Sequence, residues 1–445
     1  MVARELAEYA AKLVHANLAD DVLHDTKRCV LDTFAALLAG APNPPATLMV
    51  EALAEEIGHG RSALVPSGRL TTIRTASLIN GAAAHAMEVD DIFRDGIYHP
   101  GPPVVAAALA ACQGRGMSGD RFLRAVIAGY EVSNRVAAAM QPMHYKFWHT
   151  TGTMGTIGAA AAVSVALGLD AARTRDALAN SVTMAAGLQQ AFATDSMGKP
   201  IHAGNAAQAG ATAAILAEKG VTGAEGMFDA PKGFGNAMSH DVDWGPVVDS
   251  LDKEFTIQRM TQKNHTCCGH TFAAIDAVLA LKAEHGLAPD DVTAMTVGTY
   301  AKGVEICGTP DPKTLYEAKF SLEYTMAAAL VTGRVRFAAF TDELLRDPVM
   351  RANMAKIACH VDEAAEAAFP SRRSAVVTIT TADGRTLEHY SATRKGDPDN
   401  PLTDTELEDK FREMAEPVIG AGAAETLRQK VWKLDTVDDL AGLFA

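Results

Sequence analysis

The chain has 445 residues, of which 48% are hydrophobic and 21% charged, so its composition excludes an intrinsically disordered protein and its length allows two or three domains. Its 40 basic and 54 acidic residues give a net charge of −14, which argues against nucleic acids and anionic membranes as partners. Aromatic residues make up only 6% of the chain, and the abundance of alanine favours closely packed helices.

The local patterns indicate a cytoplasmic protein. The opening residues, with Glu5 and Glu8 among apolar neighbours, are typical of an amphipathic helix rather than of a signal peptide. The most apolar run, residues 157–169, is shorter than the ~18 residues that a membrane span needs. The six cysteines form no CxxC pair, so we expect neither a disulfide framework nor a thiolate zinc site.

Helical periodicity dominates the chain up to about residue 250. Apolar residues recur at helical spacing over 22–40, and a second run over 102–116 starts with two prolines and ends at glycines, which is the usual asymmetry of helix ends. The segments 120–140 and 153–169 repeat the periodicity. Alanine and glycine are so frequent in 153–169 that neighbouring helices are expected to approach it closely.

The pattern changes near residue 265. Residues 292–300 and 375–381 are rich in β-branched side chains, and an Asp383-Gly384 turn followed by 387–392 predicts a hairpin. Helical segments are predicted between these strands and again in the tail, at 272–284, 316–332, 342–355 and 404–445. We therefore predict a mainly α fold: a large all-helical domain from residues 1–265 and 396–445, with a smaller α+β lid domain inserted at 266–395.

Four polar clusters interrupt the apolar sequence. In the first, residues 85–101, Glu88 lies three residues after His85, so that on a helix the two share a face. Asp90 and Asp91 follow, and His99 precedes a Pro-Gly pair that would project it into a cleft. The alternative for this cluster is a helix end with solvated acidic side chains.

The second and third clusters favour anion binding. His149 and Thr150 open a helix whose free N–H groups suit a carboxylate, although threonines also cap helices without any ligand. Lys199, between Gly198 and Pro200 in the cluster 195–210, is placed to supply a positive charge to a carboxylate or an enolate. The alternative for Lys199 is an ordinary exposed loop lysine.

The fourth cluster, residues 263–272, contains His265 and His270 on either side of Cys267 and Cys268. Its spacing matches no known zinc pattern, so we expect no metal there, and adjacent cysteines are more often buried small hydrophobic residues. The sequence has neither a GxSxG elbow nor a Walker loop, and its one GxGxxG string, Gly114 to Gly119, follows a helical run where a dinucleotide site requires a strand. Hydrolase, kinase and dehydrogenase activities therefore lose support.

At these clusters the sequence resembles the MmgE/PrpD family, whose members include 2-methylcitrate dehydratases, cis-aconitate decarboxylases and iminodisuccinate epimerases. The resemblance runs through most of the chain and rests on the order and spacing of several motifs: RCVLDTFAALLAG at 28–40, NGAAAHAMEVDD at 80–91, HPG at 99–101, HTTGTMGTIGAAAAVSVALGLD at 149–170, GKPIHAGNAAQAG at 198–210, CCGHTFAAIDAV at 267–278 and YEAKFSLEYTMAAAL at 316–330. Three positions depart from it: Glu88 stands where many relatives have an aspartate, Ile92 where they have a threonine, and Phe272 where a histidine is often found.

The resemblance implies a homodimer with an active site between its two domains and with neither a metal nor an organic cofactor. It implies a lyase that removes a proton or a carboxylate next to a carboxylate of a small polycarboxylate, as a dehydratase first and a decarboxylase second. An epimerase of an amino-polycarboxylate such as iminodisuccinate is the alternative. A metal-dependent enzyme using His85, Glu88 and His99, or a non-catalytic binding protein, remains as a further possibility.

The hypothesis for the mechanism assigns a role to each residue. His99 is the general acid/base, because a neutral imidazole suits proton transfer near pH 7. Lys199 and His149 bind carboxylates, and Glu88 or Asp91 orients a histidine or moves the second proton. The residues expected to bind substrate are Asp90, Tyr145, Thr150, His265 and His270, with Tyr145 also a candidate acid.

Overall fold

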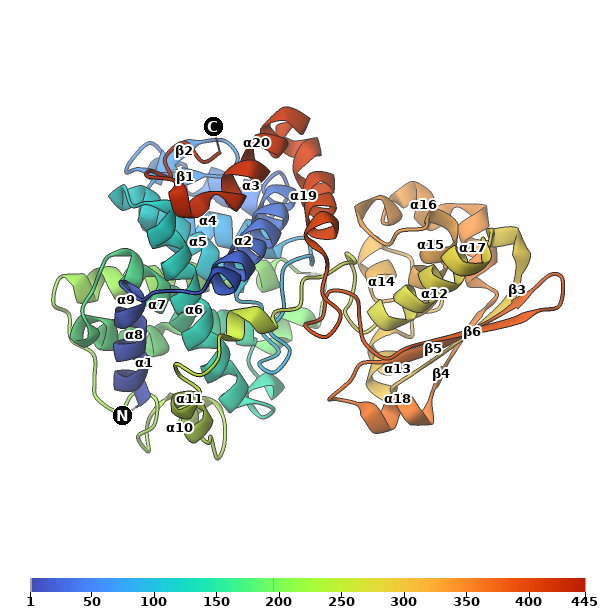
Figure 1. The fold of residues 1–445 in the computed structure, drawn as a ribbon, viewed down its shortest axis with the longest axis horizontal. Coiled ribbons are helices and arrows are strands. Elements are labelled where there is room, and N and C mark those ends of the chain that lie inside the picture. The colour runs from blue at the N-terminus through green and yellow to red at the C-terminus, as the bar shows by residue number, and fades with distance from the viewer. Residues whose placement is uncertain (1, 195, 445) are drawn as a thin grey trace. The chain divides into compact units, whose positions relative to one another are not determined.

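The computed structural model describes residues 2–194 and 196–444 and divides into two compact units (Figure 1). The larger unit is made of residues 1–262 and 403–445, and the smaller unit is the intervening segment 263–402. The prediction of a mainly helical fold is confirmed.

The larger unit is a bundle of helices with one short hairpin. Its helices are α1 (Val2–Leu13), α2 (Asp20–Gly40), α3 (Ala46–Ala52), α4 (Ile73–His85), α5 (Gly101–Arg115), α6 (Gly119–Met140), α7 (Thr150–Ala166), α8 (Ala171–Met184), α9 (Gly198–Glu218), α10 (Phe234–Met238), α11 (Gly245–Asp249), α19 (Asp404–Ile419) and α20 (Ala421–Trp432). The antiparallel pair β1 (Ser62–Leu64) and β2 (Arg69–Thr71) corrects the expectation that this part is all-helical.

Helix α7 lies at the centre of the larger unit. Every residue from Thr150 to Ala166 is buried, and α6, α8, α9 and α5 all pack against it. The stretch 150–167 is also long and apolar enough to cross a membrane by composition alone, but 94% of it is buried inside this unit, as expected of a core helix. The small side chains predicted to allow close packing therefore serve the bundle core.

The chain's C-terminal helices belong to the larger unit, because α19 packs along α2. The Lys410 ammonium of α19 is buried, forms an ion pair with Asp32 of α2, and donates to the carbonyl of Val89 (2.7 Å). A buried ammonium needs such partners, since an uncompensated buried charge is strongly destabilising. This contact ties α19 to the loop that follows α4.

The smaller unit is built on a four-stranded sheet in the order β4-β3-β5-β6. β3 (Val292–Thr299) runs parallel to β4 (Ile357–Val361) and antiparallel to β5 (Ala375–Thr381), which forms a hairpin with β6 (Thr386–Ser391). Its helices are α12 (Phe272–His285), α13 (Ala301–Cys307), α14 (Leu315–Lys319), α15 (Leu322–Thr332), α16 (Asp342–Arg346), α17 (Pro348–Met354) and α18 (Glu363–Ala368).

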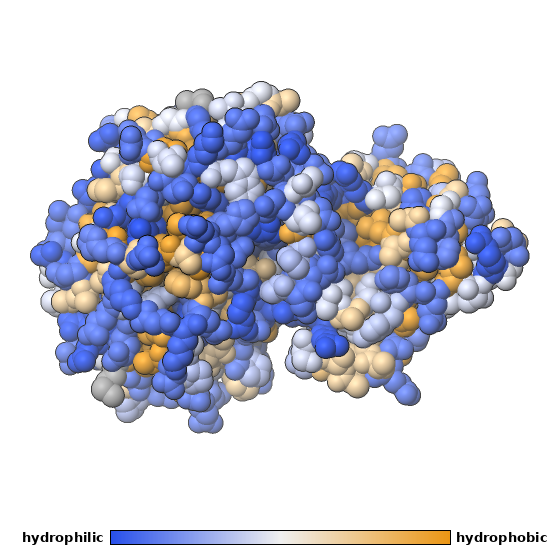
Figure 2. Space-filling model, viewed as in Figure 1, coloured by the Kyte–Doolittle hydropathy of each residue, from blue (hydrophilic) through white to orange (hydrophobic). Residues whose placement is uncertain are grey.

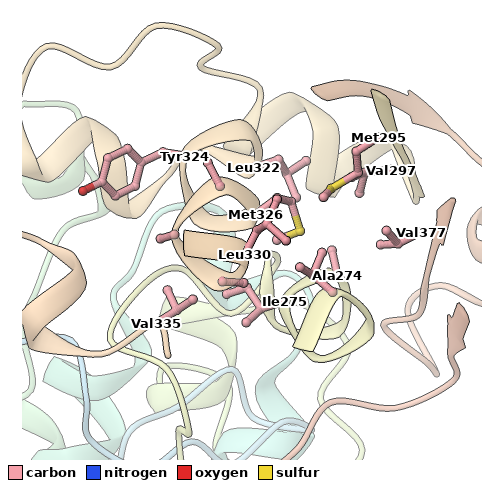
Figure 3. Close-up of a cluster of buried hydrophobic side chains, with 14 of the residues drawn as sticks. Ala274, Ile275, Met295, Val297, Leu322, Tyr324, Met326, Leu330, Val335 and Val377 are labelled. Carbon is pink, nitrogen blue, oxygen red and sulfur yellow. The ribbon is translucent and has the colours of Figure 1, made fainter. Parts of the chain in front are cut away.

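The core of the smaller unit lies between its sheet and helices α12 and α15 (Figure 3). Burial alternates along β5, so Val377 faces inward, together with Met295 and Val297 of β3. Ile275 and Leu330 approach from the helices. This is the period-two pattern of a sheet with one covered face.

Two predictions for the smaller unit are corrected, and one strand is added to them. The predicted helix 316–332 is interrupted at Ser321, whose hydroxyl accepts from the N–H of Tyr324 and so starts α15 as a separate helix. The predicted helix 342–355 is interrupted before Pro348, which has no N–H to continue it. Strand β4 has no counterpart among the predicted strands.

Figure 2 shows that hydrophilic residues cover most of the visible face of each unit, with smaller apolar areas among them. The exposed large apolar side chains include Leu188, which is 54% exposed, and Ile201, which is 41% exposed.

The close approach of α9 to α7 gives a stability test. A Cβ at Gly210 would lie 2.5 Å from the carbonyl oxygen of Thr156 and 2.6 Å from the Cβ of Ala159. We expect Gly210→Ala to lower the free energy of unfolding by about 1–3 kcal/mol, because the two backbones must move apart.

The matched control is Gly422→Ala on α20, where an added Cβ meets nothing within 4 Å. In this variant the free energy of unfolding is expected to rise by about 0.4–1 kcal/mol, since alanine loses less backbone entropy on entering a helix than glycine does. Denaturant unfolding of both variants measures the difference, and equal stabilities would contradict the packing argument.

Candidate active site

The loop between α4 and α5 brings two histidines onto one carboxylate. His85 is the last residue of α4, and His99 lies just before α5. Asp90 Oδ2 lies 2.8 Å from His85 Nδ1 and 3.1 Å from His99 Nδ1. Asp90 and His85 are fully buried, whereas the His99 side chain remains 15% exposed. Of these three groups, His99 is therefore the one that solvent or a substrate can reach.

The hydrogen bonds define which nitrogens carry protons. His99 Nδ1 also lies 2.8 Å from the carbonyl oxygen of Asp91, and a carbonyl only accepts, so Nδ1 is the donor. Burial raises the pKa of Asp90, but the charges and hydrogen bonds of His85 and His99 outweigh burial and hold that pKa well below its ordinary value. Asp90 is thus a carboxylate, both Nδ1 atoms donate toward it, and in neutral His99 the basic nitrogen is Nε2.

Asp91 has a different environment from Asp90. Its carboxyl group accepts from the N–H of Gly101 (3.0 Å) and from the hydroxyl of Tyr130 (2.7 Å). Burial, followed by the nearby Asp32 carboxylate, raises the pKa of Asp91 to about 8. At pH 7 Asp91 is therefore mainly protonated. Its carboxyl group supports the start of α5, while Asp90 is the carboxylate that contacts the histidines.

Lys199 and Glu88 form an ion pair within electrostatic reach of Asp90. Lys199, near the start of α9, binds Glu88 Oε1, and its ammonium lies 5.7 Å from the ring centre of Phe192. Burial lowers the pKa of Lys199, but the charge of Glu88 and its hydrogen bond raise that pKa by more than burial lowers it. The pKa therefore stands above its ordinary value and the ammonium stays charged. Glu88 itself has a positive φ of 60°, which is uncommon outside glycine and often accompanies a functional constraint.

His149 extends the group of histidines. Its ring stacks on His85 with centres 5.5 Å apart, and its Nδ1 lies 3.1 Å from Nδ1 of His202. Burial, followed by the charge of His85, lowers the pKa of both His149 and His202, so both rings are neutral near pH 7 and one Nδ1 donates to the other. His202 also lines a mainly apolar hollow of about 690 Å³.

The other predicted residues divide between the two units. Tyr145 is partly buried and lies within electrostatic reach of Lys199, and Thr150 is buried at the start of α7, where its hydroxyl accepts from Gln141 (3.2 Å). His265 and His270 lie in the smaller unit, where His265 Nε2 contacts Asp276 (2.9 Å). Asp195, which begins the third sequence cluster, lies outside the described residues.

His85, Asp90 and His99 are also placed to hold a cation. In the part of the chain that the structure describes they form the one such group, with ligand atoms within 4.8 Å of one another. Asp90 rather than Glu88 completes it, because the Glu88 carboxylate pairs with Lys199. However, both Nδ1 atoms carry protons toward oxygens, and a cation would have to use the Nε2 atoms.

Sequence reasoning missed His202 and Tyr130 as parts of this site. A signal for His202 was present, because it lies three residues after Lys199 and a helix places such residues on one face. Tyr130 lies in GYEVSNRV at 129–136, a segment that also resembles the family, but its contact with Asp91 arises only through the fold.

Comparison with known proteins matches the chain to two family models. The MmgE/PrpD N-terminal domain matches residues 4–246, and the MmgE/PrpD C-terminal domain matches residues 265–436. Human cis-aconitate decarboxylase is 28% identical over the whole chain and 94% of its own length. The cis-aconitate decarboxylase-like protein of Aspergillus oryzae and the mouse cis-aconitate decarboxylase are each 28% identical over the whole chain and over 96% and 93% of their own lengths.

The environment of Asp91 predicts how stability depends on pH. The folded chain retains a proton up to a pKa of about 8 that the unfolded chain releases near ~3.9, so the free energy of unfolding falls as pH rises between these values. We expect Asp91→Asn, which carries no such proton, to lose this decline and to show a flatter curve between pH 4 and pH 8.

Chemical unfolding at several pH values measures the slope of the free energy of unfolding against pH. The hydrogen bonds that Asp91→Asn alters change this free energy by the same amount at every pH, so they do not change the slope. Asp249→Asn, at an exposed position on α11, is the control, and its curve is expected to run parallel to that of the wild type. Equal slopes for the wild type and Asp91→Asn would contradict the assignment.

Proposed function

The chain belongs to the MmgE/PrpD family, and we propose that it is a carboxy-lyase that releases CO₂ from a small polycarboxylate such as cis-aconitate. The observation that carries this proposal is the partly exposed His99, held by the buried Asp90 carboxylate in the group of side chains that includes the charged Lys199. The names of the full-length relatives support the same class of reaction.

The chemistry needs one proton donor at carbon. When the bond to the leaving carboxylate breaks, its electron pair stays on the substrate and a proton must be added there. Protonated His99 supplies that proton from Nε2, and the Asp90 carboxylate, 3.1 Å from Nδ1, stabilises the positive charge on the ring beforehand. Water then returns a proton to His99, so the net reaction consumes one proton for each CO₂ released.

Lys199 binds a carboxylate that remains on the substrate. Its ammonium is already paired with Glu88, so a substrate carboxylate would replace Glu88 without leaving a charge unpaired. The neutral His149 nearby offers a hydrogen bond rather than a second charge. Binding therefore depends on exchanging one carboxylate for another at a single ammonium.

The names of the relatives favour the carboxy-lyase over the dehydratase, which the sequence ranked first, and His99 alone can supply the one proton that this reaction needs. Dehydration needs a base for the carbon-bound proton and an acid for the departing hydroxide, and epimerisation needs donors on two faces. His85 and Asp90 are fully buried and Asp91 is bound to Tyr130 and Gly101, so His99 is the accessible group among them. One accessible donor suffices for decarboxylation.

Turnover in heavy water tests this function. With cis-aconitate we expect CO₂ release and one solvent deuterium on carbon in each product molecule. His99→Ala should reduce kcat/KM by about 10²-fold or more, while the product that still forms keeps its one deuterium. The control is His59→Ala, an exposed histidine of the larger unit, which should behave as the wild type does.

Parallel assays with 2-methylcitrate and iminodisuccinate separate the outcomes. Loss of water from 2-methylcitrate without CO₂ release from cis-aconitate would make the protein a dehydratase. Conversion of iminodisuccinate into another stereoisomer, with solvent deuterium taken up and neither water nor CO₂ lost, would make it an epimerase. If none of these acids reacts, or if His99→Ala keeps its rate, the proposal fails.

A second test concerns the ion pair. Lys199→Ala removes the ammonium, so we expect KM to rise by about 10–100-fold, the value of a charge-assisted hydrogen bond. Glu88→Gln removes only the competing carboxylate, so KM should stay equal or fall while kcat is kept.

Lys219→Ala, at the exposed end of α9, is the control for Lys199→Ala and should leave KM unchanged. If kcat instead collapses in Glu88→Gln, Glu88 moves a proton in the reaction and is more than a partner of Lys199.

A further inference from the structure

The smaller unit contains a second polar group, centred on His270 and Tyr300. His270 Nδ1 lies 2.7 Å from the hydroxyl of Tyr300, and the Tyr300 ring stacks on Phe369 with centres 4.4 Å apart. Tyr300 is buried at the end of β3, while His270 is partly exposed. The group therefore reaches the surface of this unit at the imidazole.

Arg373 is held beside this group by the sheet. It lies between Phe369, which stacks on Tyr300, and Ser374, whose carbonyl accepts from the hydroxyl of Thr299 (3.0 Å). Since Thr299 directly precedes Tyr300, the backbone on both sides of Arg373 is tied to the same end of β3. The guanidinium is within electrostatic reach of both Tyr300 and His270.

A second guanidinium lies within electrostatic reach of Arg373 and is neutralised by a carboxylate. Arg394 is buried and donates to both carboxylate oxygens of Asp397 (2.9 and 2.7 Å) and to the carbonyl of Gly269 (3.2 Å). Arg373 is partly buried and, among the residues that the structure describes, makes no hydrogen bond or ion pair. Its five donors are therefore available, close to a like charge that an anion would offset.

The remaining groups here are uncharged near neutral pH. Burial, followed by the charges of Arg373 and Arg394, lowers the pKa of His270 to about 3, and burial raises the pKa of Tyr300. Neutral His270 then accepts from Tyr300 at Nδ1 and keeps a proton on Nε2 to donate. The exposed Lys302 is charged but pairs with Glu305 (2.9 Å). Of the three cations that act on His270, Arg373 is therefore the one that makes no ion pair with the residues that the structure describes.

We propose that Arg373, with His270 and Tyr300 beside it, forms an anion site in the smaller unit that takes one carboxylate group. A single positive charge matches one carboxylate better than a phosphate dianion, and the planar fork of a guanidinium fits the two oxygens of a carboxylate. The site stands on the residues of the smaller unit and does not depend on the reaction proposed above.

Binding of tricarballylate, an unreactive tricarboxylate, to the full chain tests the site. We expect Arg373→Gln to weaken binding by about tenfold or more in calorimetric titration, because it removes a charge-assisted fork. Arg372→Gln is the matched control: it changes the same residue type one position earlier, where the side chain is exposed, and should bind as the wild type does.

A local readout separates this site from Lys199. Titrating histidine-labelled protein with tricarballylate should shift the His270 ring resonances in the wild type and in Lys199→Ala, and should leave them unshifted in Arg373→Gln. The ring of His270 should also take up its proton at higher pH in Arg373→Gln, because a neighbouring positive charge is gone.

Unchanged binding and an unchanged His270 response in Arg373→Gln would overturn the site. Binding of inorganic phosphate without binding of tricarballylate would overturn its assignment to carboxylates. If tricarballylate binds through Arg373 but the wild type turns over no polycarboxylate, the anion site stands and the proposed reaction fails. If the wild type turns over cis-aconitate while Arg373→Gln binds tricarballylate normally, the reaction stands and the anion site fails.

Discussion

The candidate active site depends on one buried carboxylate that two histidines share. Asp90 accepts from His85 at the end of α4 and from His99 at the start of α5, so it links two helices that are separated by a long loop. A buried carboxylate without donors would take up a proton, and buried histidines without an acceptor would lose one. Asp90 therefore keeps its charge because the two histidines donate to it, and the two rings keep their orientation because Asp90 accepts from them.

Distant parts of the chain hold this loop in place. Lys410, from the C-terminal helix α19, donates to the carbonyl of Val89 and pairs with Asp32 on α2. On the other side of Asp90, the protonated Asp91 binds Tyr130 and the N–H of Gly101. Because Asp91 stays mainly neutral at pH 7, the loop does not place two negative carboxylates next to each other.

Sequence patterns predicted the mainly helical fold, the β3 and β5–β6 strands and the chemical types of the site residues, because periodicity and unusual polar clusters are local properties. They gave the histidine-orienting role to Glu88 or Asp91 and substrate binding to Asp90, whereas in the structure Asp90 is the carboxylate that contacts His85 and His99. Neighbouring aspartates in one loop differ only in what the fold packs against them, and the sequence does not show that packing. The pairing of Glu88 with Lys199, and the contact of His149 with His202, likewise depend on how α4, α7 and α9 pack. The breaks at Ser321 and Pro348 were visible in the sequence as a cap and a proline, but apolar periodicity outweighed them.

The two cations that bear on function differ in what surrounds them. Lys199 is charged and already paired with Glu88, so a ligand gains there only by replacing a carboxylate with another carboxylate, and a neutral analogue gains nothing. Arg373 has a neutralised guanidinium beside it and neutral donors around it, so any carboxylate that arrives adds a new ion pair. In a chain with a net charge of −14, long-range attraction does not bring polycarboxylates to the surface. Selectivity for them must come from such local positive charges, and a pre-paired ammonium rejects uncharged molecules more strictly than an unpaired one does.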